Sequence, residues 1–458
     1  MGHLVDHTTL NRAAKIFMDD GRAVTPEAAL EMLNRFGLTI SVGSEIAQSR
    51  DQQIALLTLI NVARRTFLAG VEVVGPLETP VLSSLLPAPT LADAVSMLGG
   101  RPAAHRRPDW PCAIIGNAQA RDGTAPSWHL TWDGWRGGVI PTRDSQLRLS
   151  EGTSLPLAPM MAAAACAGEV FSFHAKDHAM AGRRAAGFSL WKPGTNWLTT
   201  DTSEPTLQFL PSKLWLIGLG NLGQAFAWII AGLPYDSLSD LQLFLQDYDT
   251  VAMSNDSTSL LTYPMFVGLK KSRMVADWLA LRGFETTIEE RKFGEWIHRA
   301  SHEPGVAICG VDNALARSAL DKAGFSLVVE AGLGAGPQGF RNFAIHTLPA
   351  SRTADQIWSH LVGANSVDVS DRPAYQALKR AGLDACGLTQ LASRTVGAPF
   401  VGLIAAGFTI SELLRRLHGG TAAEMLSGSV AALDNIELVT IPADTYDHGH
   451  VDVSPKRH

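Results

Sequence analysis

Cysteine is scarce in this chain, and its scarcity argues against two classes of protein. The 458 residues contain four cysteines, Cys112, Cys166, Cys309 and Cys386, and none of them forms a Cys-x-x-Cys pair with another. Zinc ribbons require such pairs, and small disulfide-held secreted domains are much richer in cysteine. We therefore expect neither structural zinc nor a disulfide framework, and a reducing cytoplasm is the default location.

Long apolar runs and an excess of basic charge are also missing. The longest apolar runs, 160–168 and 400–408, are shorter than the ~20 residues of a membrane helix, and the opening MGHLVDHTTLNRAAKIF lacks the apolar core of a secretory signal. The formal net charge is −6, which leaves no basic footprint for nucleic acid. We expect buried core helices, no membrane span and no nucleic-acid partner.

Apolar residues make up 46% of the chain, enough for packed cores, and the length predicts two or three domains. In the second half, the strand-like segments KLWLIGLG, LQLFLQDYD, VAICGVDN and SLVVEAGLG alternate with helix-like segments, and a further helix is predicted over 397–417. This alternation is typical of a parallel sheet with helices on both faces. We predict an α/β fold with a Rossmann-like sheet.

A glycine loop follows the first strand of that half, in WLIGLGNLGQAFAWII. Gly218 permits a tight turn, Gly220 lets the backbone approach a phosphate, and Gly223 lets the helix pack closely on the strand. The N–H groups at the start of the helix then face an anion. Asp247 and Asp249 end the second strand, where an acid can hold ribose hydroxyls. The loop and the acids alone leave NAD and ATP both open.

Two later segments favour ATP. The stretch QDYDTVAMSNDS places Asn255 after the acids, and Lys271 opens a helix sixteen residues further on. The stretch VDNALAR then contains Asp312 and Asn313, followed by Arg317. In this order and spacing, the motifs resemble the adenylating enzymes of the ubiquitin-activating (E1), ThiF and MoeB type. The resemblance is specific over about 100 residues and extends more weakly over 213–418.

The resemblance implies a chemistry and a role for each residue. Such enzymes join a carboxylate to the α-phosphate of ATP, so negative charge must be neutralised and the reactants aligned. Asp249, or Asp247, would hold the ribose, and Asn255 and Lys271 would reach the phosphates. Asp312 would position Mg²⁺, beside Asn313 in the nucleotide site. Two alternatives remain for Lys271: it could be a solvent-exposed lysine at the start of a helix, or Lys270 beside it could be the functional one. Asp312 could instead be a helix N-cap.

The sequence departs from the family pattern at one place. Thr258 and Ser259 stand where the family continues Asn-x-x-Arg-Gln, so one phosphate-binding arginine is missing. Known members take a further arginine from the partner unit of a dimer. Arg64 and Arg65 are candidates if the first half is that partner, although two solvated arginines at a helix end are the favoured reading.

The first half lacks the motifs of the second. We predict helices within 1–35, with Gly37 as a C-cap, then a helix ending at Gly70, a strand VEVVG, a hairpin in SWHLTWDGWRGGVIP and a small-residue helix over 158–174. The stretch 155–173 is similar in shape to 396–414. The first half is therefore either an adenylation-like domain that has lost activity, forming a pseudo-heterodimer within the chain, or an unrelated domain that docks the substrate protein. Further dimerisation stays open.

We divide the chain into an N-terminal domain (1–190), a linker (191–210), an adenylation domain (211–435) with a cysteine segment near 380–395, and a tail (436–458). E1 enzymes carry the acyl group on a cysteine as a thioester. Cys386 lies in a loop-like, glycine-flanked segment before a helix, where a thiol pKa falls, whereas the other three cysteines lie in predicted core.

The overall hypothesis is an E1-like enzyme that uses ATP and Mg²⁺. It would adenylate a ubiquitin-like protein, load it on Cys386 and pass it to an E2-like partner, in the manner of bacterial E1-like proteins. Such proteins are often linked to antiviral defence, which here is analogy only. The alternatives are an adenylyltransferase without a thioester step, an NAD-dependent oxidoreductase, which gives Lys271 and Asp312 no role, and a scaffold that has lost turnover.

Overall fold

The computed structural model describes most of the chain. The described ranges are 9–119, 124–152, 155–361, 371–383, 385–393, 396–442 and 445–454, without the side chains of residues 385, 386, 390 and 393.

The first half forms a seven-stranded sheet in the order β3-β2-β1-β4-β5-β6-β7. Strands β1 to β5 pair in parallel, and β6 and β7 then pair antiparallel. Its elements are α1 (Ala14–Asp19), α2 (Pro26–Leu33), β1 (Gly37–Val42), η1 (Ser44–Ala47), α3 (Arg50–Ala63), β2 (Gly70–Val74), α4 (Leu91–Met97), β3 (Arg101–Pro102), β4 (Cys112–Ile115), β5 (Ser127–Asp133), β6 (Arg136–Pro141), η2 (Thr142–Leu147), α5 (Leu157–Ala175) and β7 (Ala186–Ser189).

The second half forms an eight-stranded sheet in the order β11-β10-β9-β12-β13-β14-β15-β16, and β17 pairs with β8 in a separate small sheet. Its strands are β8 (Phe209–Pro211), β9 (Lys213–Ile217), β10 (Gln242–Gln246), β11 (Thr286–Glu289), β12 (Val306–Cys309), β13 (Leu327–Leu333), β14 (Asn342–Leu348), β15 (Ala422–Ser429), β16 (Ala432–Ile441) and β17 (His450–Asp452). Its helices are α6 (Asn221–Gly232), η3 (Leu238–Asp240), η4 (Met253–Ser257), η5 (Pro264–Phe266), α7 (Lys271–Ala280), α8 (Ala314–Arg317), η6 (Leu320–Lys322), α9 (Gly336–Gly339), α10 (Ala354–Trp358), η7 (Ser359–Leu361), α11 (Pro373–Arg380), α12 (Ala385–Ser393) and α13 (Pro399–Leu417).

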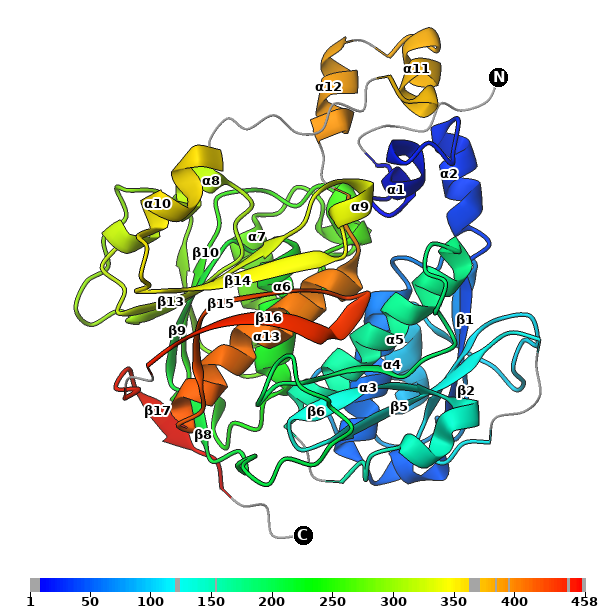
Figure 1. The fold of residues 1–458 in the computed structure, drawn as a ribbon, viewed down its shortest axis with the longest axis horizontal. Coiled ribbons are helices and arrows are strands. Elements are labelled where there is room, and N and C mark those ends of the chain that lie inside the picture. The colour runs from blue at the N-terminus through cyan, green and yellow to red at the C-terminus, as the bar shows by residue number, and fades with distance from the viewer. Residues whose placement is uncertain are drawn as a thin grey trace.

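The two sheets share one connection pattern. In each sheet, the first strand in sequence lies between the second and the fourth, and the pairing changes from parallel to antiparallel after the fifth. Helices α5 and α13, which contain the similar stretches noted in the sequence, contact each other, while α5 packs on β6 and α13 on β13 (Figure 1). The prediction of an α/β fold with a Rossmann-like sheet is confirmed.

Small residues explain why α5 and α13 approach so closely. A Cβ on Gly407 of α13 would lie 2.2 Å from the sulfur of Met161 on α5. The apolar runs 160–168 and 400–408 are buried inside these helices, as predicted. Among the residues that the structure describes, no helix combines the length and apolar character that a membrane crossing requires.

Several local predictions were wrong. Gly37 begins β1 and does not cap a helix, because the chain turns directly into the sheet after Phe36. The stretch ALARSALDKAG forms only the single turn α8 followed by η6. The possible strand expected from about residue 436 is present, since residues 436–441 lie in β16, and His450–Asp452 pairs with β8. β14 and β15 were not anticipated.

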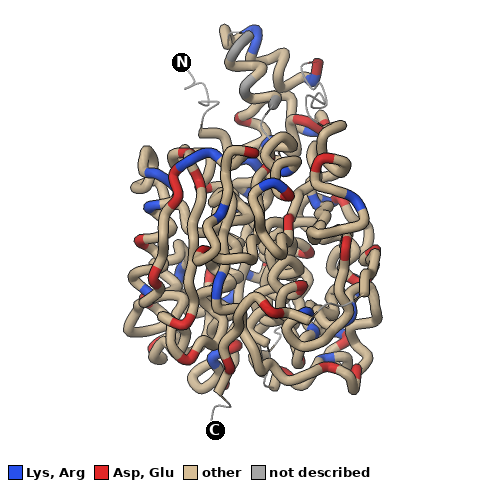
Figure 2. The backbone as a smooth tube through the Cα atoms, turned by 90° about the vertical axis from the view of Figure 1, so that its left-hand side faces the viewer, with Lys and Arg blue, Asp and Glu red and all other residues tan. Residues whose placement is uncertain are grey.

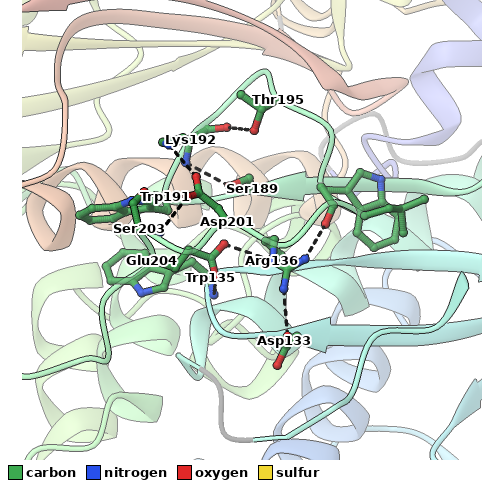
Figure 3. Close-up of polar contacts among 12 residues, drawn as sticks. Asp133, Trp135, Arg136, Ser189, Trp191, Lys192, Thr195, Asp201, Ser203 and Glu204 are labelled. Carbon is green, nitrogen blue, oxygen red and sulfur yellow. Dashed lines mark hydrogen bonds and ion pairs between the residues drawn. The ribbon is translucent and has the colours of Figure 1, made fainter.

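The segment predicted as a linker is held by polar contacts to the first sheet (Figure 3). Arg136 of β6 lies 2.9 Å from Asp133 and 3.2 Å from Glu204, and Lys192 lies 2.7 Å from Asp201. Because Arg136 is 3% exposed, its ion pair with Glu204 fixes the connection on the surface of the sheet. In the view of Figure 2, basic and acidic residues are interspersed along the chain.

Candidate active site

A pocket of about 390 Å³ opens where β9, β10 and β12 end. The carboxyl ends of parallel strands, at the point where the strand order reverses, are where such sheets bind ligands. Most of the site residues expected from the sequence line this pocket, namely Gly218, Gly220, Asp247, Asp249, Asn255, Lys271, Asp312 and Asn313. Chain segments far apart in sequence therefore meet in one crevice.

The glycine loop has the geometry that its three glycines require. Gly218 has φ +83°, and a Cβ on Gly223 would lie 1.9 Å from the carbonyl oxygen of Gly218, so a side chain at 223 would separate the helix from the loop. A Cβ on Gly220 would meet no atom within 4 Å. The protein itself therefore does not fill the space in front of Gly220, which is the space a phosphate needs. Gly223 packs the loop and does not line the pocket.

The first acid, Asp247, is occupied in holding this loop. One carboxylate oxygen accepts the backbone N–H of Leu219 at 2.7 Å, and the other accepts the N–H of Asp249 at 2.8 Å. Asp247 is 8% exposed, and burial raises its pKa against the opposing attraction of Lys271. We therefore conclude that the main role of Asp247 is to hold the glycine loop in its conformation.

The second acid, Asp249, is more open and forms an ion pair. Its side chain is 46% exposed, and it lies 2.9 Å from Nζ of Lys271, whose side chain is 12% exposed. An ammonium has three donors, so this contact leaves Lys271 able to donate to a phosphate. Lys270, the alternative lysine, donates to the backbone oxygen of Tyr248 and does not line the pocket.

Three further wall residues differ in how they are held. The amide oxygen of Asn255 accepts the N–H of Ala252 at 2.8 Å, so its NH₂ group is the part that could donate to a ligand. Asn313, rather than Asp312, caps α8, since its oxygen accepts the N–H of Leu315 at 2.8 Å. Asp312 is exposed at the pocket wall, free of the cap role that was its alternative.

The sequence analysis missed one arginine and gave another no role. Arg12, which precedes α1, lines the pocket, and a Cβ on Gly397 opposite would lie 3.9 Å from its Cδ. The backbone N–H of Arg12 donates to Ser257 at 3.2 Å. Arg317 also lines the pocket. In the sequence, Arg12 stands out only by its place before the first helix. That place does not indicate that the residue lies beside the pocket of the second half.

Arg64 and Arg65 are neither in the pocket nor solvated. Arg64 lies 2.8 Å from Asp256, and Arg65, which is 2% exposed, donates to the carbonyl of Leu260 at 2.7 Å. Burial lowers the pKa of Arg65 to about 9. The two arginines at the end of α3 therefore join the first half to η4 and to the loop that follows it in the second half. The prediction that they reach the nucleotide site and the alternative that they are solvated were both wrong.

The three cysteines expected in the core are buried. Cys112, Cys166 and Cys309 are buried free thiols, and burial raises the pKa of each, that of Cys309 to about 12. Cys386 lies in the first turn of α12 and not in a loop, and its side chain is outside the described residues. The chain after α12 returns to the pocket at Val396 and Gly397.

The residues present fit a nucleotide and a magnesium ion. Within the described part of the chain, no group of three or more His, Cys, Asp or Glu side chains gathers as a metal centre. Mg²⁺ bound with a nucleotide takes one or two protein carboxylates and completes its shell with phosphates and water. Asp312, one of three aspartates that line the pocket, could therefore supply the carboxylate, and the open space before Gly220 has room for phosphates.

Together, the fold and the pocket define a Rossmann-like α/β protein with a glycine loop of the kind found in nucleotide-binding sites. The family described as BilD N-terminal domain matches residues 37–190, and that described as BilD C-terminal domain matches residues 210–420. The Bacterial E1-like protein BilD of Collimonas sp. (strain OK412) is 59% identical over 455 residues, covering 99% of this chain and 98% of that one. The chain belongs to the BilD family of bacterial E1-like proteins, which confirms the resemblance seen in its motifs.

Solved structures of E. coli MccB are also similar in part. The structure with succinimide has a TM-score of 0.33 and 10% identity, and the structure with ATP has a TM-score of 0.32 and 10% identity. Both matches cover 50% of this chain and 64% of the MccB chain, which is less than two thirds of its length.

Proposed function

We propose that this protein activates the C-terminal carboxylate of a ubiquitin-like protein with ATP. The observation that carries the proposal is the single pocket wall on which the glycine loop, Asp249, Lys271 and Asp312 meet. Membership of the E1-like BilD family supports it, because E1-like describes activation of such carriers. The NAD alternative uses the glycine loop and Asp249 but leaves Lys271 and Asp312 without a role.

The chemistry assigns a task to each wall residue. A carboxylate oxygen of the carrier attacks the α-phosphorus of ATP, the bond to the β-phosphate breaks, and pyrophosphate leaves. Asp249 accepts from the ribose, while the backbone around Gly220 and the ammonium of Lys271 face the phosphates. Asp312 would hold Mg²⁺, which would supply positive charge against the phosphates. These groups stabilise charge that develops in the transition state.

Arg12 is our candidate for the missing phosphate-binding arginine. It comes from a segment packed beside the first half, yet it lines the pocket of the second. Thr258 and Ser259, which stand where the family pattern has Arg-Gln, line the same pocket. A guanidinium from Arg12 would therefore supply charge that this chain lacks at 258. The first half would then act as the partner unit of a pseudo-heterodimer within one chain.

We further propose that the acyl group moves from AMP to Cys386 and then to an E2-like protein. The thiolate of Cys386 attacks the acyl carbon, and AMP leaves. The first turn of a helix favours the thiolate, since the helix N-terminus carries partial positive charge. The three buried cysteines have raised pKa values and are poor alternatives. We also propose that the protein is cytoplasmic and acts in antiviral defence.

The thioester step is tested by a non-reducing gel after incubation with Mg·ATP and a candidate ubiquitin-like protein. We expect a thiol-labile adduct that is lost in Cys386→Ala and kept in Cys309→Ala. An adduct that survives Cys386→Ala would place the thioester elsewhere. Pyrophosphate exchange without any adduct would leave an adenylyltransferase and make Cys386 structural.

A further inference from the structure

Glu330 is a carboxylate buried in the middle of an apolar strand. It lies on β13 between Val329 and Ala331 and is 0% exposed. Its neighbour in register on β12 is Cys309, three residues before Asp312 at the pocket wall. Burying a carboxylate costs several kcal/mol unless it is paired. Its partners therefore show what the carboxylate does.

Two side chains approach Glu330 from opposite sides. Nε of Arg317 lies 2.8 Å from one carboxylate oxygen, and Nδ1 of His346 on β14 lies 3.2 Å from the other. The His346 ring packs edge-on against Trp358, with ring centroids 5.2 Å apart, and neither residue lines the pocket. Arg317 is the partner that lines the pocket. Glu330 itself does not line it, so any effect of Glu330 on a ligand would pass through Arg317.

The remaining contacts of Arg317 leave it little freedom. Its Nε donates to the backbone oxygen of Val311 at 2.8 Å, next to Asp312. Its guanidinium lies over Gly332, where a Cβ would come within 3.0 Å of Nη1. A glycine at 332 therefore makes room for the guanidinium. The single Nε–H is donated to Val311, and Oε1 of Glu330 accepts no hydrogen bond from the described residues, so Glu330 holds the guanidinium by charge attraction. Arg317 is therefore held at the pocket wall by its bond to Val311, the residue that precedes Asp312.

We infer that Glu330 is a positioning residue that fixes the guanidinium of Arg317 at the wall of the nucleotide pocket. The inference rests on the proposed function, because it assigns Arg317 a contact with the negative charge of the bound nucleotide. Glu330 touches no reactant. It sets the place of Arg317 before the nucleotide arrives, so that no reorganisation is needed in the reaction.

The test compares Glu330→Gln with Glu412→Gln, which removes a second buried carboxylate that pairs with arginine outside the pocket. Glu412 of α13 is also buried and pairs with Arg415 and Arg416, and none of the three lines the pocket. Both Glu→Gln variants remove a buried carboxylate beside arginine. We expect Glu330→Gln to raise the KM for ATP in pyrophosphate exchange about tenfold, and Glu412→Gln to lower Tm with KM unchanged.

A double-variant cycle separates positioning from mere stability. If Glu330 acts through Arg317, Glu330→Gln adds little to the KM of Arg317→Lys, because the group it positions is already altered. Should Glu330→Gln fail to fold, Gly332→Ala presses on Nη1 without touching the carboxylate and is expected to raise KM as well. An unchanged KM in both Glu330→Gln and Gly332→Ala, or fully multiplicative effects in the double variant, would overturn the inference.

Failure of the proposed function would show differently. If the wild-type protein binds ATP but exchanges no pyrophosphate with any carrier, the proposed activity fails, and the same variants are then compared by the Kd for ATP. A Kd raised about tenfold in Glu330→Gln but not in Glu412→Gln keeps the inference. Equal Kd values, or no ATP binding by the wild type, overturn it.

Discussion

The carboxylate of Asp247 accepts the backbone N–H of Leu219 at 2.7 Å, so the first acid after β10 holds the glycine loop that follows β9. Two adjacent strands thereby fix the loop before any ligand binds. Asp249, two residues on, points its carboxylate at Lys271 instead. The two acids, which the sequence cannot separate, have different structural tasks.

That division predicts opposite consequences for two alanine variants. Asp247→Ala leaves two partly buried N–H groups without acceptors and should lower the free energy of unfolding by about 1–3 kcal/mol. Asp249→Ala should change stability by less than about 0.5 kcal/mol, because its ion pair is half exposed, yet raise the KM for ATP about tenfold. Urea unfolding and exchange kinetics measure the two effects. Equal effects on stability would refute the division.

Lys271 should be essential for turnover, and its neighbour should not. Lys271→Ala removes the ammonium from the pocket wall, and we expect pyrophosphate exchange to fall about 10²–10³-fold. Lys270→Ala is the matched control, because Lys270 does not line the pocket, and its exchange rate should stay within about twofold. If Lys270→Ala proves the more damaging variant, the assignment of the two lysines is reversed.

Arg12 tests whether the N-terminal segment completes the pocket. We expect Arg12→Ala to reduce kcat for exchange about 10²-fold, with Arg12→Lys in between, because an arginine donates in a planar fork that lysine lacks. Arg35, exposed in the same part of the chain, supplies the control. An Arg12→Ala variant that turns over as fast as Arg35→Ala would leave the missing phosphate contact unexplained.

His129 makes stability depend on pH. Burial lowers its pKa to about 4 in the folded protein, from an ordinary value near 6.5, with the positive charge of Arg148 as a second cause. A folded-state pKa below the unfolded value means that the stability contribution is present above about pH 6.5 and is lost as pH falls toward 4. We expect His129→Gln to unfold with a shallower pH dependence between pH 6.5 and 4. His174 and His418, whose pKa values are also lowered, would keep part of the dependence.

The elements that have a regular local pattern of apolar residues could be predicted from the sequence. The elements that form only because of contacts with distant parts of the chain could not. The glycine loop, the strands β9, β10, β12 and β13 and the helices α5 and α13 follow from local apolar patterns. Strands β14 and β15 contain mixed residues and become strands because β13 offers an edge to β14, and β14 then offers one to β15. Gly37 reads as a helix cap but is drawn into β1 by pairing with Gly70.

For the site too, the sequence predicted the residues that lie in local motifs but not those brought in by distant contacts. Gly218, Asp249, Lys271 and Asp312 lie in ordered motifs, and their common pocket was therefore predictable. Arg12 is more than 200 residues from every other polar member of the wall, and no local pattern brings it there. The role of Arg65 was equally hidden, because its acceptor at Leu260 is an ordinary backbone carbonyl.

The measurement that tests the central claim most directly is ATP–pyrophosphate exchange with purified candidate ubiquitin-like proteins. We expect exchange that requires a carrier, is lost when the terminal carboxylate of the carrier is removed, and falls about 10²–10³-fold in Lys271→Ala. No exchange with any carrier, together with measurable binding of NAD, would contradict the account and return the glycine loop to the dehydrogenases.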